Sequence, residues 1–532
     1  MNKCKLYVEE PGKYANISRD WFIDEEPGWR VINQGIILPW KSANDPRHPY
    51  GGLGGVCDAE GVFVEGHKVV LDRPDYALRV CDAYPITEDI ECFSETVVYC
   101  GVIISHWGHF VVECLSRMWW LIENESCQHK LIFIVTFDAF DSCTTLLEYF
   151  YMLGIEKERI VLLRQPTRFD SVIVPSQSSY IYSGYKRKAM KVYDAIRDSV
   201  EPAAYKKVYF TRTKLHKHVQ QRDATNEEYF EDYFRKNGFE IIAPEKLPIK
   251  EQLAIAAGAQ EIACVFGSLH HHALFAQAGI KLTLLCRVSG HIEKPIFWIN
   301  QAKKASCILE DVSANFLPRI PYYSAYFLAP NRYWDMYRQE YFEDYDSSDR
   351  DAWRHNLIGY IEAWIKTTLV TRHFELRMCG EEIKTLTDFI TFYCKYVLDY
   401  EIDEHAKVRL NDVFTKTEIT ASDRKQKILY GAGHIGWYAH EYYGDKDVFA
   451  FSDKNKFGEK YYGKSILHPF ELYDIQNQFD IVICIKESQE AVDYFESMGI
   501  SNFYVFSCGD GEVSTRRHGD NSPIVNRKVL HQ

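Results

Sequence analysis

The chain has 532 residues, of which 46% are hydrophobic and 15% aromatic, and its formal net charge at pH 7 is −13. This length exceeds what one hydrophobic core normally supports and predicts several domains. The apolar content excludes a disordered protein. An acidic chain lacks the basic surface that general nucleic-acid binding requires, so we expect no nucleic-acid partner, although a local basic pocket for a phosphorylated ligand stays open.

The cysteines and the apolar runs bear on the compartment. The fifteen cysteines are scattered without repeated CxxC pairs, which favours reduced thiols in the cytoplasm. The opening stretch MNKCKLYVEEPG lacks the apolar core of a signal peptide, and no apolar run reaches the roughly 18–20 residues of a membrane span. We therefore expect a cytoplasmic protein without a transmembrane segment, and leave a peripheral membrane association open.

The first part of the chain contains many turn signals, among them DEEPGW and PRHPYGGLGG. We interpret residues 1–95 as an irregular, partly β lead-in to a first module at 96–205. In that module an opening helix is followed by apolar runs separated by helical stretches. Short buried strands that alternate with helices are typical of a parallel sheet with crossover helices, that is, of a Rossmann-like module. The predicted strands lie at 130–136, 159–163 and 171–176.

A second Rossmann-like module is predicted at 206–330. Thr225 and Glu228 have the spacing of a capping box at a helix start, and Gly238 stands where a helix end favours positive φ. Strand and helix patterns alternate along this stretch. The strands lie at 206–212, 240–245, 261–267 and 281–287, and the helices at 225–239, 248–259 and 268–279.

Three further parts follow. Residues 331–422 have a mostly helical pattern, dense in Tyr, Trp and acidic residues, and are predicted as a helical connector. A third, small Rossmann-like domain is predicted at 423–510, and the polar tail at 511–532 is expected to be poorly ordered. The predicted fold class is therefore α/β, with two Rossmann-like modules, a helical segment and a third small Rossmann-like domain.

A row of functional side chains lies in the opening helix of the first module. In HWGHFVVECLSRMWW, residues 106–120, His109, Glu113 and Arg117 recur every four residues and therefore share one helix face. A base, an acid and a cation in one row can carry out proton transfer. The structural alternative is a Glu113–Arg117 ion pair on a buried helix, with His109 as a hydrogen-bonded core residue.

The second module contains a candidate phosphate site. A strand end, a Gly-Ser turn and a helix start follow one another in FGSLHHHALF, residues 266–275. The free N–H groups of a helix start bind phosphate, and the histidines can add donors. Two arginines, whose guanidinium groups suit paired phosphate contacts, belong to the same module, one of them at the carboxyl edge of a strand, where open α/β sheets bind ligands. The candidate residues are Arg212, Arg222, Gly267, Ser268, His270, His271 and His272.

Structural interpretations of the same residues stay open at this point. Consecutive histidines on a helix point in different directions, which argues against a three-histidine metal cage, and one or two of them can pack against the sheet. Arg212 on its own is more often a surface ion-pair residue than a ligand. Joint placement at one sheet edge is what favours phosphate binding.

The stretch VYFTR…R…NEEYFEDYFRKNGFEIIAPEKLPIKEQLAIAAGAQEIACVFGSLHHHALF resembles glycosyltransferase family 61. That family has a strand ending in Arg, an R-x-x-x-N-E segment, a GFE strand before PE, an EQ helix, and a Gly-Ala/Ser loop that enters a helix. With the His-Glu-Arg row, the resemblance covers roughly residues 55–330. The family often has Asn where His272 aligns and Gly where Leu269 aligns. The matching positions are Arg212, Arg222, Asn226, Glu227, Pro244, Glu245, Glu251, Gln252, Gly267, Phe275, His109, Glu113 and Arg117.

The resemblance implies a transferase of the GT-B type that uses a nucleotide-sugar donor, most often a UDP-sugar, and inverts the anomeric carbon. It implies His109 as the base, with Glu113 orienting or replacing it, and Arg117 as a residue that holds Glu113 or reaches the donor. Glu251 and Leu269 join the expected donor-binding residues. The DYD at 344–346 lies in an acidic helical segment rather than where a donor-linked metal would bind, so we expect metal-independent chemistry with no cofactor.

The resemblance also implies a biological setting. Family members of this kind act in bacterial capsule or lipopolysaccharide synthesis, so the expected acceptor is a saccharide or a lipid-linked saccharide at the inner face of the membrane. The transferred group is expected to be a hexosyl, N-acetylhexosaminyl or pentosyl unit.

The third module carries a dinucleotide fingerprint. Gly431, Gly433 and Gly436 form G-x-G-x-x-G between a strand and a helix, and Asp453 ends the next strand. The module resembles small Rossmann-like domains appended to bacterial sugar-transfer and sugar-modifying enzymes. A nucleotide-binding or regulatory role and a purely structural role both stay open. The rival hypotheses for the whole chain are an NAD(P)-dependent oxidoreductase and a non-catalytic binder of nucleotides or glycans.

Overall fold

The structure is a computed structural model of the chain. It divides into two compact units, and each is described by itself. The first unit contains Met1–Lys217, Asn226–Asn315 and Tyr326–Trp353, and the second contains His218–Thr225, Phe316–Ala325 and Arg354–Gln532. The described residues are 4–9, 11–42, 52–64, 82–86, 90–104, 106–136, 143–181, 183–215, 224–289, 295–318, 324–346, 354–365, 380–396, 426–458, 460–469, 471–476, 478–485, 488–501, 503–509, 512–517 and 524–528.

The first sheet of the first unit has the order β4-β3-β8-β5-β6-β7, and β2 also pairs with β8. Strands β5 to β8 are mutually parallel and β2 to β4 are antiparallel to their neighbours. The strands predicted from the apolar runs are therefore confirmed. The strand bounds are β2 (Trp29–Asn33), β3 (Ile36–Ser42), β4 (Gly52–Cys57), β5 (Glu91–Ile103), β6 (Lys130–Val135), β7 (Ile160–Leu163) and β8 (Thr167–Pro175).

Helices connect these strands. A small hairpin of β9 (Ser179–Tyr180) and β10 (Gly184–Tyr185) follows β8. The helical bounds are η1 (Pro11–Ser18), α3 (Cys143–Leu146), α4 (Glu148–Met152), η5 (Lys157–Arg159) and α5 (Arg187–Asp198).

The helix predicted over 106–120 is interrupted, which corrects the single regular helix expected from the sequence. It consists of α1 (Trp107–His109), a π-helical turn η2 (Phe110–Cys114), a 3-10 turn η3 (Leu115–Arg117) and α2 (Trp119–Glu123). Nearly every side chain in this segment is buried. Packing on all sides, rather than the regular helical repeat, therefore sets the geometry of each turn, and π turns are often found at functional sites.

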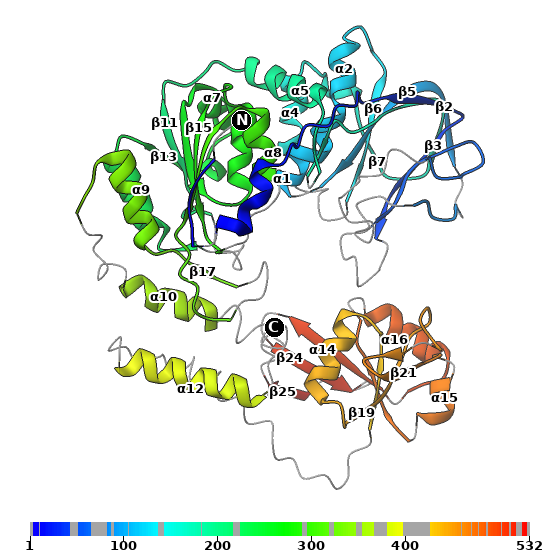
Figure 1. The fold of residues 1–532 in the computed structure, drawn as a ribbon. Helices are drawn as coiled ribbons and strands as arrows, with labels where there is room; N and C mark the ends of the chain where they lie inside the picture. The colour runs from blue at the N-terminus through cyan, green and yellow to red at the C-terminus, as the bar shows by residue number, and fades with distance from the viewer. Residues whose placement is uncertain are drawn as a thin grey trace. The chain divides into compact units, whose positions relative to one another are not determined.

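The second sheet of the first unit has the order β1-β16-β15-β14-β11-β13 and is entirely parallel. Counted from β11, its strands follow the order 2-1-3-4-5 of a doubly wound sheet. Figure 1 shows α9 on one face of this sheet and α7 and α8 on the other. The strand bounds are β11 (Lys207–Phe210), β13 (Glu240–Ile242), β14 (Glu261–Val265), β15 (Lys281–Cys286) and β16 (Ser306–Asp311).

Helical segments lie between the strands of the second sheet. The α6 helix does not begin with the predicted capping box of Thr225 and Glu228. Its N-cap is Asn226, whose φ of 74° lies in the left-handed region and whose amide donates to the Leu328 carbonyl. Gly238 has φ +81°, as the sequence predicted. The bounds are α6 (Glu227–Lys236), η6 (Pro244–Lys246), α7 (Ile249–Gly258), η7 (Ser268–Phe275), α8 (Pro295–Ala302) and α9 (Arg332–Phe342).

The N-terminal strand β1 (Lys5–Tyr7) belongs to the second sheet, which corrects its assignment to the lead-in of the first module. It pairs with β16 in parallel register, Lys5 opposite Ile308. Lys5 and the Tyr7 hydroxyl both contact the Glu340 carboxylate of α9. The strand therefore covers an otherwise open sheet edge, a long-range pairing that no local pattern encodes.

The two sheets of the first unit share one hydrophobic core. Phe275 of η7 lies 5.8 Å, centroid to centroid, from both Tyr149 of α4 and Tyr193 of α5. The α5 helix buries Val192 and Ile196 in the same core. The two modules are thus packed directly against each other, which fixes how their strand ends meet.

The second unit contains the third module, whose sheet has the order β20-β21-β19-β18-β22-β23-β24-β25. The five parallel strands β18, β19, β21, β22 and β23 follow the doubly wound order 3-2-1-4-5. The bounds are α10 (Arg354–Trp364), α12 (Gly380–Tyr396), β18 (Lys427–Tyr430), α14 (His434–Tyr443), β19 (Val448–Ser452), β20 (Lys460–Tyr461), β21 (Lys464–Leu467), α15 (Glu471–Ile475), β22 (Asp480–Ile483), α16 (Ser488–Ser497) and β23 (Phe503–Gly509).

The polar tail contains two strands, contrary to the disorder expected for it. β24 (Glu512–Arg517) pairs antiparallel with β23, and β25 (Ile524–Lys528) pairs with β24. The hydrogen bonds that β23 offers at its open edge explain why a polar, charged stretch takes strand form. Within the described ranges, no helix has both the length and the apolar character that a bilayer crossing needs.

Candidate active site

The candidate site lies where two switch points of strand order meet. In the first sheet, β5 has the next parallel strands on opposite sides, β6 and β8, and the chain leaves β5 into α1. In the second sheet, β11 lies between β13 and β14. Crevices at the carboxyl ends of strands form at such points and bind ligands in open α/β sheets. The predicted residues follow β5, β11 and β14.

His109 and Glu113 face each other across the π turn. The His109 Nδ1 lies 3.3 Å from a Glu113 carboxylate oxygen. The His109 side chain is 22% exposed and that of Glu113 is 5% exposed. A buried carboxylate next to one ring nitrogen orients the imidazole and leaves the other nitrogen, Nε2, toward the more open side. Of the two, His109 is the better placed to meet a substrate.

The Arg117 side chain packs against strands of the first sheet. Its guanidinium donates to the Pro175 carbonyl at the end of β8 and lies 5.9 Å from the Tyr99 ring centroid. A Cβ on Gly101 would come within 3.2 Å of the Arg117 Nε. Burial lowers its pKa from the ordinary value of arginine. Arg117 therefore ties η3 to the end of β8, a role that the i, i+4 spacing did not indicate.

Two arginines flank Gly267 at the end of β14. A Cβ on Gly267, whose φ is +153°, would lie 3.3 Å from an Arg212 guanidinium nitrogen and 3.7 Å from one of Arg287. Arg287 is 7% exposed, and its guanidinium lies 4.3 Å from the Tyr326 ring centroid. Sequence reasoning missed Arg287, although KLTLLCR ends in arginine after a buried strand just as KKVYFTR does.

The Glu227 carboxyl is hydrogen-bonded to the chain at Arg212, just after β11. Its carboxylate accepts the Arg212 N–H at 3.3 Å and the Tyr209 hydroxyl at 3.2 Å. Burial raises the pKa of Glu227 to about 8, and the nearby Arg212 charge acts in the opposite direction. The Glu227 carboxyl therefore holds the backbone of Arg212 at the end of β11.

His272 joins the two modules. Its ring lies between Trp107 of α1, at 4.6 Å, and Phe210 of β11, at 4.4 Å. Its ring nitrogens contact the Leu269 carbonyl at 2.9 Å and the Gln252 side-chain oxygen at 3.2 Å. Burial lowers its pKa to about 4. The aromatic stack identifies His272 as a packing residue of the contact between modules.

His270 and His271 are buried and neutral. The Nδ1 of His270 contacts the Gly267 carbonyl, and that of His271 contacts the Ser268 carbonyl at 2.8 Å. Burial lowers the pKa of His270 to about 4 and that of His271 well below its usual range. Since a carbonyl only accepts, each Nδ1 carries the proton. In this state the histidines cannot donate to phosphate from Nε2, which corrects the expectation that they add donors.

The turn that carries His109 contacts the loop after β14. A Cβ on Gly108 would lie 3.1 Å from the Ser268 Oγ and 3.3 Å from the His271 Cε1. The Trp107 ring lies 6.1 Å from that of His271. A larger residue here would require the Ser268 and His271 side chains to shift by a few tenths of an ångström. The fold thus brings the His109–Glu113 pair of one module next to the Gly267 loop of the other.

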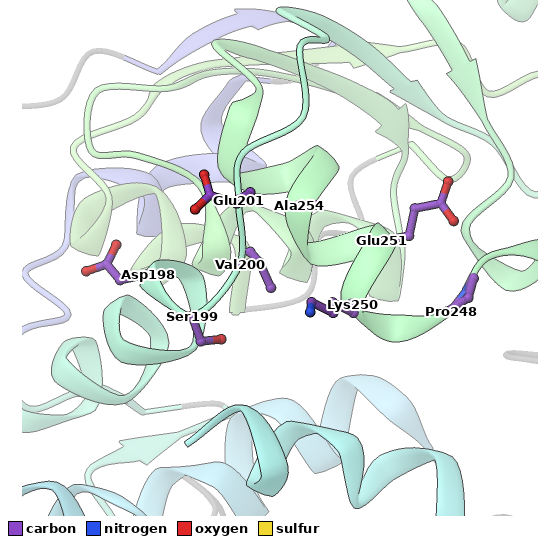
Figure 2. Close-up of a pocket in the computed structure, with 8 residues that line it drawn as sticks. All are labelled: Asp198, Ser199, Val200, Glu201, Pro248, Lys250, Glu251 and Ala254. Carbon is purple, nitrogen blue, oxygen red and sulfur yellow. The ribbon is translucent and has the colours of Figure 1, made fainter. Parts of the chain in front are cut away.

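Three further candidates are placed differently. Arg222 lies outside the described residues. Leu269 is half-buried and packs against the core. Glu251 is exposed and lines a separate pocket of about 490 Å³ between the end of α5 and the start of α7; Figure 2 shows it beside Pro248 and Lys250. The pocket residues include none of those around Gly267.

The glycine loop of the third module adopts the tight geometry that its fingerprint predicts. A Cβ on Gly436 would lie 1.8 Å from the Gly431 carbonyl oxygen, so α14 begins in direct contact with the loop. Gly433, which precedes α14, has open space around its Cα. The glycines therefore fulfil the roles of a close strand-to-helix turn.

The chain itself satisfies several groups of this loop. The Asp453 carboxylate accepts the N–H of Ala432 at 3.1 Å and that of Asn455 at 2.9 Å. The Lys456 ammonium donates to the Ala432 carbonyl, and the Tyr461 hydroxyl donates to the carbonyl of Gly433. The Asp453 carboxylate of the fingerprint thus makes hydrogen bonds within the loop itself.

Within the described part of the chain, no group of three or more His, Cys, Asp or Glu side chains is placed to hold a metal ion. The fold defines an α/β protein in which the turn after β5 contacts the loop after β14. The family model described as Glycosyltransferase 61 matches residues 107–283, and this part of the chain belongs to that family of glycosyltransferases. No curated protein matches the chain.

Proposed function

We propose that the chain is an inverting glycosyltransferase of the GT-B type, which moves a sugar from a UDP-sugar to a saccharide acceptor. The observation that carries this proposal is the contact between Gly108 and the Ser268 loop. It sets a histidine–carboxylate pair from one module against a loop flanked by two arginines from the other. A base on one side and positive charge on the other are what a single displacement at an anomeric carbon needs.

In this mechanism the acceptor hydroxyl attacks the anomeric carbon from the side of His109. A bond forms between the acceptor oxygen and this carbon, while the bond from the carbon to the diphosphate oxygen breaks. His109 Nε2 takes the hydroxyl proton, and Glu113 orients the ring and stabilises the imidazolium that forms. The geometry favours His109 over Glu113 as the base because the carboxylate is the more buried of the two.

The departing diphosphate needs compensation for its growing negative charge. We assign this role to Arg212 and Arg287, whose guanidinium nitrogens lie close to Gly267. Guanidinium groups suit paired contacts with phosphate oxygens. In this proposal the arginines take the place of a donor-linked metal ion, and no cofactor takes part.

The setting is proposed from the family resemblance. The acceptor would be a growing saccharide, free or lipid-linked, in a bacterial surface polysaccharide such as capsule or lipopolysaccharide. The enzyme would act in the cytoplasm or at the cytoplasmic face of the inner membrane, and would transfer a hexosyl, N-acetylhexosaminyl or pentosyl unit.

The test is calorimetric titration with UDP in the presence of EDTA, comparing wild type, Arg212→Ala and Arg287→Ala. Arg235→Ala is the matched control, because Arg235 is exposed on α6 and pairs with Asp232. Loss of a charge-assisted contact predicts roughly 10- to 100-fold weaker UDP binding in Arg212→Ala and Arg287→Ala. The control variant should bind UDP with the affinity of wild type. UDP binding that both variants retain at full strength, or that EDTA abolishes in wild type, refutes this donor site.

The rival oxidoreductase places its cofactor on the third module. The Asp453 carboxylate already accepts the N–H groups of Ala432 and Asn455, which leaves it fewer acceptor positions for the ribose hydroxyls of a dinucleotide. Titration with NAD under the same conditions separates the two. Binding of NAD that is insensitive to Arg212→Ala, without binding of UDP, would favour the oxidoreductase.

A further inference from the structure

His271 has one ring nitrogen available for a substrate group. Its Nδ1 contacts the Ser268 carbonyl at 2.8 Å, whereas its Nε2 is buried and has no hydrogen-bond partner among the described residues. The side chain is 3% exposed. A buried polar atom without a partner is costly, so its retention in a contact between two modules points to a ligand.

The protonation state of His271 decides what this ligand can be. Because the Ser268 carbonyl can only accept, the proton of a neutral ring lies on Nδ1 and the lone pair on Nε2. Burial is the largest influence on His271 and disfavours the imidazolium, as do His270 on its own helix and His106 and His109 on the facing turn. The contact with the Ser268 carbonyl acts in the opposite direction, but the pKa of His271 still lies well below its usual range. The Nε2 is therefore an acceptor, which a hydroxyl satisfies and a phosphate oxygen does not.

The position of His271 narrows the ligand further. Gly267, four residues before His271, lies beside the two guanidinium groups. On the other side, the Cε1 atom of His271 would be 3.3 Å from a Cβ on Gly108, which precedes His109. In a displacement, the transferred sugar lies between the leaving diphosphate and the base. His271 occupies the stretch between these two ends.

We propose that His271 recognises the transferred sugar, its Nε2 accepting a hydrogen bond from a sugar hydroxyl, while the diphosphate contacts only the arginines and the loop backbone. This inference rests on the proposed UDP-sugar transferase. Because Nε2 is covered in this structure, this contact requires α1 and η7 to move apart as the sugar enters. A site built to accept from a hydroxyl discriminates against sugars that lack this hydroxyl.

The experiment separates the sugar from the nucleotide. Calorimetry gives the affinity of wild type, His271→Leu and His271→Gln for UDP and for a panel of UDP-hexoses, UDP-N-acetylhexosamines and UDP-pentoses. Leucine removes the acceptor at similar volume, and glutamine retains an oxygen near the position of Nε2. We expect UDP affinity within about twofold of wild type in both variants, and a threefold to tenfold loss of the added affinity from the preferred sugar in the leucine variant alone, roughly the worth of one hydrogen bond.

Titrating UDP from pH 5.5 to 8 supplies a second readout. A neutral acceptor predicts the same pH profile in wild type and in His271→Leu, whereas an imidazolium that held phosphate would strengthen UDP binding at low pH in wild type only. Such a difference, or equal loss of UDP and UDP-sugar affinity in the leucine variant, identifies a phosphate ligand and overturns the inference.

Three further outcomes are distinct. If the leucine variant keeps the full gain in affinity of the UDP-sugar over UDP, His271 only packs between the modules and the inference is wrong. A wild type that binds UDP but gains nothing from any sugar overturns the inference while leaving the nucleotide site intact. A wild type that binds neither UDP nor any UDP-sugar refutes the proposed donor, and the inference with it. Thermal melting of each variant shows whether a change in affinity accompanies a loss of fold.

Discussion

Replacing Glu227 by glutamine should change how stability depends on pH. The folded protein holds this carboxyl, 1% exposed, with a pKa of about 8, whereas the ordinary value is 4.5. Between these values the folded state binds one proton more than the unfolded state, so the free energy of unfolding falls as the pH rises. Glutamine keeps an oxygen acceptor for the Arg212 N–H and the Tyr209 hydroxyl and carries no charge, so it mimics the protonated form.

The size of the effect follows from the shift. Each pKa unit corresponds to about 1.4 kcal/mol, so from pH 5 to pH 8 the wild type should lose roughly 3–4 kcal/mol relative to Glu227→Gln. In calorimetric melting this corresponds to a relative change on the order of 10 °C for a unit of this size. Comparing the two proteins at each pH removes the contributions of all other titrating groups that the substitution leaves unchanged.

Glu228→Gln is the matched control, because Glu228 is adjacent on α6 and exposed. The two proteins, wild type and Glu228→Gln, should melt with parallel pH profiles. If the Glu227→Gln profile also runs parallel to that of wild type, the carboxyl ionises near its ordinary pKa. Glu227 would then be ionised next to Arg212 in the folded protein. That outcome would refute the inference that burial raises its pKa.

The other predictions concern the site and the third module. His109→Ala and Glu113→Gln should each lower kcat by roughly 10²- to 10⁴-fold with UDP affinity within about twofold of wild type; a variant that instead loses UDP binding would place that residue in the donor site. Gly267→Ala and Gly279→Ala both introduce a side chain at positive φ, which should lower the free energy of unfolding by about 1–3 kcal/mol. Only the alanine at 267 would contact Arg212, so only Gly267→Ala should weaken UDP binding, by about tenfold. Gly436→Ala should destabilise the third module by roughly 3 kcal/mol or more, seen as a shifted melting transition with unchanged UDP affinity; an unshifted transition would show that α14 can move away from the loop.

The central parallel strands β6, β14 and β15 were predictable because they are buried on both faces and therefore appear in the sequence as short apolar runs. The runs at 130–136, 261–267 and 281–287 correspond to β6, β14 and β15. The strands β1 and β24 were not predicted as members of their sheets. Each completes the edge of a sheet through pairing with residues distant in sequence, and a short strand of mixed polarity carries no local signal of its partner.

Part of the site was predictable from the rule that ligands bind where parallel strands end. Arg212 and Gly267 follow that rule, and the same rule applied to the strand at 281–287 would have found Arg287. The roles of Arg117 and His272 could not be predicted from spacing. They depend on the Pro175 carbonyl and on the aromatic stack with Trp107 and Phe210, and these contacts exist only once the sheets are assembled.

Although the chain as a whole is acidic, the two sides of the site differ in charge. Positive charge lies beside Gly267, at Arg212 and Arg287, and the buried Glu113 carboxyl lies beside His109 on the opposite module. In the proposed site the neutral His271 lies between them. In the proposed displacement, electrons move toward the diphosphate while the proton moves toward the carboxylate side. Fixed charges of this arrangement stabilise both movements in the transition state without reorganising. A protonated His271 would place positive charge next to the base and oppose the proton transfer, so its burial in neutral form serves the same chemistry as the arginines.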